Sequence, residues 1–268
     1  MLSVRELLRS GGLQIADVLC THGRGRGQGS ELSSGYALVL VRRGCFVRSA
    51  DGHETILDPT LGYCMNPQEE QRYDHPHHGG DTCTSLVLSA SLLVELWGDD
   101  SPLPSGSLAV TPALDLEHRR LLAQIRAGTD QHEAAERGIE LGAQMLELAD
   151  TRRVANGAPS TGHARRKLAD GARELLAEHT HHSLPSLAHR LAVSPHHLSR
   201  AFREVTGQTI SRHRMRLRSR EVLERISQGE RDLARLAVEA GFADQSHLCR
   251  VVVAETGETP SALRALLG

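Results

Sequence analysis

The sequence predicts an α+β chain: a small antiparallel β-barrel, a helical connector, and an all-α domain with two helix-turn-helix units. Three patterns support this. Short apolar runs between Gly, Pro, Asn and Asp fill about the first ninety residues, as in barrels and sandwiches. Longer segments follow with apolar residues three and four positions apart. A helix, tight turn, helix pattern then occurs twice. We expect the barrel at 1–97, the connector at 98–155, a linker at 156–162 and the all-α domain at 163–268.

Turn residues divide the first segment into strands. Arg42, Arg43 and Gly44 favour a turn that pairs the strand before them with the strand after them, and Asp51-Gly52 is typical of a second hairpin turn. Strands are expected at 36–41, 45–49, 54–57, 61–65 and 82–88.

A short helix at 91–97 is expected to end the barrel segment, and the connector then begins with a surface crossing at 98–112 that is rich in Pro and Ser. Two amphipathic helices are expected at 114–128 and 132–154. Their apolar stripes must be covered, either by a second copy in a homodimer or by the barrel itself, and the sequence leaves both open. The linker at 156–162 consists of Gly, Pro and small residues that cannot build a core.

The all-α domain repeats one pattern. In the first copy, Ser194 suits a helix cap and Pro195 the first helical position. In the second copy, Gly241 permits the turn and Asp244 is the expected cap. A helix-turn-helix lays its second helix in the DNA major groove. The inward stripes of these second helices are Leu198, Ala201 and Phe202, and Leu248, Val251 and Val252.

Between the copies, five arginines alternate along one expected helix at 211–226. They cannot share one face, so some are expected to point outward, where their charge can meet phosphates. The arginines are Arg212, Arg214, Arg216, Arg218 and Arg220.

Residues 241–250 and 255–264 together resemble the signature of the AraC/XylS family of bacterial transcription regulators. The chain departs from it by having valines at 251–253, where an aromatic is usual, and Leu263 before Arg264. Both changes stay apolar, so the fold should persist with looser packing. The resemblance implies a double-stranded DNA-binding regulator, with RNA polymerase as a partner.

The strand-rich half is similar to the cupin-type sensing domain of many such regulators. That resemblance rests on the order of strands and on Asn66-Pro67, His75-Pro76 and the segment 79–84. It implies a barrel that senses a small effector.

Charge divides the chain in the same way. Residues 163–268 carry 17 Lys and Arg against 12 Asp and Glu, whereas 1–162 carry 14 against 21, so the C-terminal part suits a polyanion. A membrane span is not expected, because no run of about 18 apolar residues occurs. The N-terminus lacks a signal-peptide core, so we expect a cytoplasmic protein. Five cysteines without a tight CxxC argue against a disulfide framework.

Exposed positions early in each second helix are the candidates for contacting base edges. Arg can bind guanine and Gln adenine in a bidentate manner, each worth about 1–3 kcal/mol of discrimination. The candidates are Ser194, His196, Ser199 and Arg200 in the first copy, and Gln245, Ser246, His247 and Arg250 in the second.

A group of imidazoles and thiols in the barrel raises a second hypothesis. These side chains suit zinc or copper, so a metal-responsive regulator is one alternative. A thiol-redox switch through Cys64 and Cys83 is another. We favour a plainer interpretation, with loop histidines in solvent and cysteines acting as small hydrophobes. The candidate ligands are Cys64, His75, His77, His78 and Cys83.

A cupin metalloenzyme fused to a DNA-binding domain is a further alternative, because His75-x-His77 followed by Asp81 is similar to such ligand runs. The distal histidine that it needs is missing between His78 and His118. The glycines at 23–29 alternate with arginines and precede no helix, so they suit a loop, not a phosphate cradle. We therefore expect no catalysis. A structural nucleoid protein would leave the strand-rich half unexplained.

Overall fold

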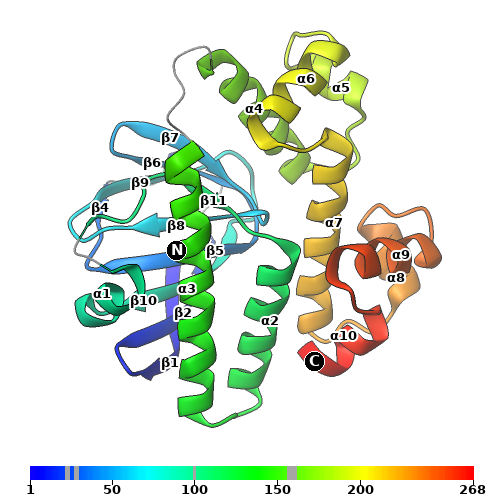
Figure 1. The fold of residues 1–268 in the computed structure, drawn as a ribbon. Coiled ribbons are helices and arrows are strands. Elements are labelled where there is room, and N and C mark those ends of the chain that lie inside the picture. Colours follow the sequence, from blue (N-terminus) through cyan, green and yellow to red (C-terminus); the bar gives the residue numbers. More distant parts are fainter. Residues whose placement is uncertain (22–24, 27–29, 99–100, 156–161) are drawn as a thin grey trace. The chain divides into compact units, whose positions relative to one another are not determined.

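The structure is a computed structural model that describes residues 1–21, 25–26, 30–98, 101–155 and 162–268 (Figure 1). The chain divides into two compact units, Met1–Gly157 with Ala265–Gly268, and Ala158–Arg264. The connector expected at 98–155 thus belongs to the same unit as the strands. Most of the expected linker at 156–162 and of the glycine-rich loop at 23–29 lies outside the described residues. No helix in the described parts is long and apolar enough to cross a membrane.

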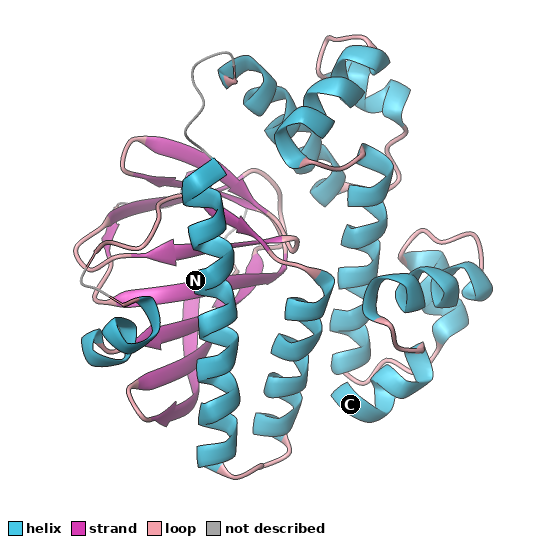
Figure 2. Cartoon of the chain, viewed as in Figure 1, coloured by secondary structure: helices cyan, strands magenta, loops and turns pink. Residues whose placement is uncertain are grey.

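The first unit contains two antiparallel sheets, drawn in magenta in Figure 2. The larger sheet has the strand order β1 (Leu2–Ser10), β2 (Leu13–Cys20), β10 (Asp81–Leu88), β5 (Tyr36–Arg43), β8 (Leu61–Met65) and β11 (Ser107–Ala109). The smaller sheet has the order β3 (Gly25–Arg26), β9 (Glu70–His75), β6 (Phe46–Ala50) and β7 (His53–Leu57), with β4 (Glu31–Leu32) also paired to β9. The two antiparallel sheets agree with the antiparallel strand-rich domain that the sequence predicted.

The inner strands β5, β8 and β10 of the larger sheet bury side chains on both faces, which alternate along each strand. One face joins helices in an apolar cluster that includes Leu38 and Cys64. The other face, with Val41 and Cys83, meets the smaller sheet in a second cluster around Phe46. A residue's position along a strand therefore decides whether it faces the helices or the space between the sheets.

One expected hairpin is wrong. β5 pairs with β10 and β8, while β6 pairs with β7 and β9, so the segments at 36–41 and 45–49 belong to different sheets. Gly44, at φ +86°, makes the crossing, where a Cβ would lie 2.3 Å from the Gly80 carbonyl oxygen. The turn at Asp51-Gly52 is confirmed, with both residues at positive φ (50° and 73°) between β6 and β7.

Among the described residues, six strands lie outside the five ranges expected from the sequence: β1, β2, β3, β4, β9 and β11. β1 and β9 interleave charged residues with apolar ones, so neither presents an apolar run. His75 is the last residue of β9 and only 5% exposed, which corrects its expected place on a loop. His77 and His78 do lie in the loop that follows.

The helices that follow the strands lie close to their expected places, with α1 at Ala90–Trp97, and α2 at Pro112–Arg126 and α3 at Gln131–Ala155 in the connector. Their apolar side chains, among them Leu121 and Met145, share one buried cluster with β2 and β5. The stripes are thus covered inside the unit, which is the barrel-packing interpretation, and they give no argument for a dimer seam.

The second unit is helical: α4 (His163–Glu178), α5 (Leu184–Arg190), α6 (Pro195–Thr206), α7 (Ile210–Ser227), α8 (Leu233–Glu239), α9 (Gln245–Thr256) and the start of α10 (Pro260–Leu267), up to Arg264. α5 and α6 form the first helix-turn-helix, α8 and α9 form the second, and α7 joins them (Figure 1). As expected, the five α7 arginines do not share one environment: Arg212 is exposed, whereas Arg218 and Arg220 are buried.

Candidate nucleic-acid interface

The two helix-turn-helix units end in the same way, fifty residues apart. The Thr206 hydroxyl donates to the Phe202 carbonyl at 2.7 Å and accepts the Gln208 N–H. Thr256 repeats both bonds, with the Val252 carbonyl and the Glu258 N–H. A glycine in the left-handed region, Gly207 or Gly257, then ends each second helix. The sequence Thr-Gly-x-Thr therefore fixes the end of each recognition helix and the start of the next helix.

The two turns differ by one residue. In the first, the Val193 N–H donates to the Ala188 carbonyl; in the second, the Phe242 N–H donates to the Ala237 carbonyl, an offset of forty-nine. The caps that follow, Ser194 and Asp244, are offset by fifty. The second turn thus contains one additional residue, Ala243.

The caps hold the start of each recognition helix. The Ser194 hydroxyl accepts the His197 N–H at 3.2 Å, and the Asp244 carboxylate accepts the His247 N–H at 2.7 Å. Ser194, predicted as a base contact, thus already serves as a cap. Among the other predicted positions, His196, Arg200, Gln245, Ser246 and Arg250 are exposed, whereas Ser199 and His247 are half-buried.

The two recognition arginines have different neighbours. Arg200 Nε lies 3.7 Å from Glu204 Oε1, and Arg165 also reaches Glu204, at 3.1 Å. Fifty residues on, Arg250 occupies the position of Arg200, but Ala254 replaces the acid. Arg250 therefore keeps its charge clear of that competing carboxylate.

Behind the second turn, α7 supplies structural cations. Arg218 donates to the Thr180 carbonyl at 3.0 Å and to the carbonyl of Gly241. Arg214 donates to the His182 carbonyl at 2.5 Å. Burial, together with the charge of Arg214, lowers the pKa of the Arg218 guanidinium from its ordinary value. Arg214 and Arg218 therefore bind backbone carbonyls, a role that the alternation of arginines in the sequence did not predict.

In the first unit, the five predicted metal ligands do not converge. Cys64 faces the helices and Cys83 faces the smaller sheet, so the larger sheet separates the two thiols and they cannot form the redox pair considered above. His77 and His78 lie in the loop beyond β9. Of the predicted set, only His75 belongs to a convergent group.

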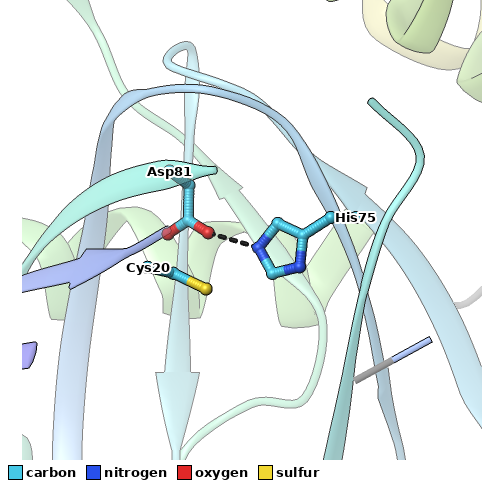
Figure 3. A group of neighbouring side chains, drawn as sticks. All are labelled: Cys20, His75 and Asp81. Carbon is cyan, nitrogen blue, oxygen red and sulfur yellow. Dashed lines mark hydrogen bonds and ion pairs between the residues drawn. The ribbon is translucent and has the colours of Figure 1, made fainter. Parts of the chain in front are cut away.

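That group is Cys20, His75 and Asp81, all buried (Figure 3). One ligand atom from each lies within 4.8 Å of the others. His75 Nε2 and Asp81 Oδ1 are 2.6 Å apart, and the Cys83 thiol donates to Asp81 Oδ2 at 3.3 Å. Burial, and next the charge of Asp81, raise the pKa of the Cys83 thiol well above its usual range. Cys20 was missed because its proximity to Asp81 depends on the pairing of β2 with β10.

Arg48 lies on the same face of β6 as Phe46, which packs against the larger sheet. Arg48 donates to Gln71 and Glu69, each at 2.8 Å, and its guanidinium lies 4.8 Å from the centre of the Tyr63 ring. An open pocket of about 510 Å³ lies elsewhere in this unit, lined by the β1–β2 turn, residues 34–36 and the end of β10.

Comparison with known proteins bears mainly on the second unit. A family described as a helix-turn-helix domain matches residues 187–265. No curated protein sequence matches the chain. The structure of ToxT from Vibrio cholerae is similar over 97% of this chain and 100% of its own, at 11% identity and a TM-score of 0.39. A cupin superfamily protein from Desulfitobacterium hafniense is similar over 33% of this chain and 77% of its own, at 18% identity and a TM-score of 0.28. Likenesses this distant say nothing about ligands.

The matched segment contains both helix-turn-helix units, from the middle of α5 to α10. The repeated Thr-Gly-x-Thr ends and the exposed helix starts lie inside it. Residues 187–265 are therefore an AraC-type helix-turn-helix domain.

Proposed function

We propose that this protein regulates transcription by placing α6 and α9 in successive major grooves on one face of a DNA duplex. The observation that carries the proposal is the pair of capped helices with exposed starts in one compact unit. α7 has 18 residues. At 1.5 Å per residue it spans about 27 Å, comparable to one turn of DNA at about 34 Å.

Within this arrangement, the strongest base contact is assigned to Arg250. Its side chain is exposed near the start of α9, and no acid occupies the position that Glu204 has beside Arg200. Gln245, the first residue of α9, suits adenine. His196, Ser199, Ser246 and His247 complete the proposed contact surface, and Ser194 contributes as the cap of α6.

The test begins with a randomised duplex library enriched on the full-length protein. Arg250→Ala should weaken binding to the selected duplex by about 10- to 150-fold, the equivalent of about 1–3 kcal/mol, with a much smaller loss on random duplex. Arg203→Ala, an exposed change near the end of α6, should affect both duplexes alike. Failure to enrich any sequence would refute sequence-specific regulation, and equal losses from Arg250→Ala on both duplexes would remove its role as a base contact.

We further propose that the first unit senses a small effector in the open pocket beside the β1–β2 turn. Its volume of about 510 Å³ lies within the range of small-molecule sites, about 300–1,000 Å³. Gly35 lines it, and a Cβ there would meet only Val87, at 3.8 Å. A metabolite that raises the unfolding midpoint of the wild type should therefore lose that effect in Gly35→Leu. An unchanged effect would place the effector elsewhere.

Family resemblance extends the proposal to a cytoplasmic protein whose bound DNA lies next to RNA polymerase. Promoter activity in a reporter strain should then change when the gene is deleted, and Arg250→Ala should reproduce the change. Normal regulation by that variant would contradict the assignment.

A further inference from the structure

The convergent group lies where the two sheets of the first unit meet. Cys20 ends β2 and Asp81 begins β10, and the two residues are direct cross-strand partners. Cross-strand partners project from the same face of a sheet, with their Cβ atoms about 5 Å apart. His75, the last residue of β9, comes from the smaller sheet. One thiol, one carboxylate and one imidazole from two sheets therefore point at a common place (Figure 3).

Two glycines allow the backbone to close tightly at this end. A Cβ on Gly80 would lie 1.8 Å from the Cys20 carbonyl oxygen, and a Cβ on Gly44 would lie 2.9 Å from the Asp81 Cβ. Any other residue at either place would push the start of β10 away from its neighbours. The glycines thus set the position of Asp81 against Cys20 and His75.

We propose that Cys20 Sγ, His75 Nε2 and the Asp81 carboxylate bind one transition-metal ion of the zinc class. Thiolate, imidazole and carboxylate are the ligand types that zinc takes in proteins. Zinc–ligand bonds of about 2.0–2.3 Å in a tetrahedron place ligand atoms roughly 3.3–3.7 Å apart. Separations in the group of up to 4.8 Å would shorten by about 1 Å, and the 2.6 Å contact between His75 and Asp81 would open by about 1 Å.

Cys83 acts on this site as a positioning residue. Its thiol donates to Asp81 Oδ2 at 3.3 Å, which leaves Oδ1 directed toward His75. Partners of this kind orient metal ligands, and their loss commonly weakens metal affinity about 10- to 100-fold. On binding, the Cys20 thiol releases its proton to solvent, and the His75 ring keeps its proton on Nδ1 so that Nε2 offers a lone pair.

The ligand set differs from the one that the sequence suggested. His77 and His78 lie in the loop beyond β9, and Cys64 is buried on the other face of the larger sheet. Cys64→Ser is therefore a matched control for Cys20→Ser, because each replaces a buried thiol of the same sheet. His78→Gln controls for imidazoles in the loop.

The experiment uses the full-length protein stripped of metal by a chelator. Zn²⁺ affinity is measured by competition with a chromophoric chelator, and Co²⁺ is added to detect thiolate-to-cobalt absorption. The wild type should bind one ion per chain with that absorption. Cys20→Ser, His75→Asn and Asp81→Asn should each lose more than about 100-fold in affinity, and Cys83→Ala about 10- to 100-fold. Cys64→Ser and His78→Gln should match the wild type.

A measurement on the wild type alone covers the case in which the ligand variants misfold. X-ray absorption of the Zn²⁺ complex should give one sulfur and at least two nitrogen or oxygen neighbours around the ion. A first shell without sulfur, less than one ion per chain, or a full loss of binding in Cys64→Ser or His78→Gln would each overturn the assignment. Metal binding is measured without DNA, so it and the proposed DNA recognition can fail independently.

Discussion

The first and second helix-turn-helix units share their ends and differ at their starts. Both close with the Thr-Gly-x-Thr bonds described above, and both recognition helices begin at a side-chain cap. The first turn uses Ala192 at φ +54°, whereas the second uses Gly241 at φ +82° and a buried arginine. The helix-turn-helix fold therefore accommodates two different turns, while the end of the recognition helix stays the same.

The buried side chains of the two helix-turn-helix units also differ. Phe202 is fully buried in the first helix-turn-helix unit, in an apolar cluster with Ala169 and Leu198. Its counterpart fifty residues on is Val252, which is also fully buried but smaller. The second helix-turn-helix unit has polar contacts instead: Arg218 of α7 donates to the Gly241 carbonyl, and Glu230 accepts the Asp232 N–H. We therefore expect the stability of the first helix-turn-helix unit to depend on apolar packing, and that of the second on hydrogen bonds and charge.

The largest effect should come from Gly241→Ala. Its Cβ would lie 2.6 Å from His181 Cε1 and 2.9 Å from Arg218 Cζ, at a positive φ. We expect a loss of about 2–4 kcal/mol in the free energy of unfolding, from the backbone strain and the displaced Arg218 bond. Gly257→Ala has the same strain but nothing within 4 Å, so it should cost only about 1–2 kcal/mol. Equal losses in denaturant titrations would mean that Arg218 does not hold the turn.

The next effect is confined to acid. Glu230 accepts the backbone N–H groups of Asp232 and Arg231 and pairs with Arg225 and Arg235. The Asp232 hydrogen bond, then the two arginines, lower its pKa to about 2. A lowered folded pKa stabilises the protein above the ordinary value of about 4.5, and this contribution is lost as the pH falls toward 2.

Glu230→Gln should therefore flatten the acid side of the stability profile of the second helix-turn-helix unit. Hydrogen exchange of α5 and α8 amides, compared between pH 6 and pH 3, measures it. α8 should lose protection in acid in the wild type and less so in Glu230→Gln. α5, whose corresponding position is His181, should be indifferent to the change. An equal response of both helices would contradict a local role for Glu230.

A smaller effect should appear in DNA affinity. Glu204→Ala releases Arg200 from an exposed ion pair, which is worth about 0.2–1 kcal/mol. Binding to the selected duplex should tighten by up to about 5-fold, because Arg200 would then lack a neighbouring acid, as Arg250 does. The gain should disappear in a Glu204→Ala, Arg200→Ala double variant. A gain that persists there would come from the removed negative charge alone.

The smallest effect should be a stabilisation. Ala192 is exposed and lies in the left-handed region, where glycine is unstrained. Ala192→Gly should raise the free energy of unfolding by about 0.5–1 kcal/mol, after the greater chain entropy of glycine is set against the relieved strain. A lower unfolding midpoint would show that the first turn needs the methyl group.

The helical half was predictable because its signals are local. Caps at Ser194 and Asp244 and the turn at Gly241 lie within a few residues of the structure that they set. The fate of Arg218 was not predictable, because its partners Thr180 and Gly241 stand 38 and 23 positions away. Charge alternation along a helix cannot distinguish an outward arginine from one that holds a distant carbonyl.

The strand-rich half was predicted in class but not in pairing. Local turn signals put β5 beside β6, whereas long-range pairing put β5 between β10 and β8. The same limit hid the Cys20, His75 and Asp81 group. The sequence pattern favoured the neighbouring histidines of the loop, whereas the third residue of the group is Cys20, at the end of β2.

The additional residue in the second turn matters for anyone who wishes to exchange DNA specificity between the units. Counted from the first helix of each unit, position 196 would be copied to 245; counted from the caps, it belongs at 246. One residue rotates a helix by about 100°, enough to turn a side chain from the groove toward the protein. Grafted specificities should therefore be aligned on Ser194 and Asp244, and Ala243 left in place as a spacer.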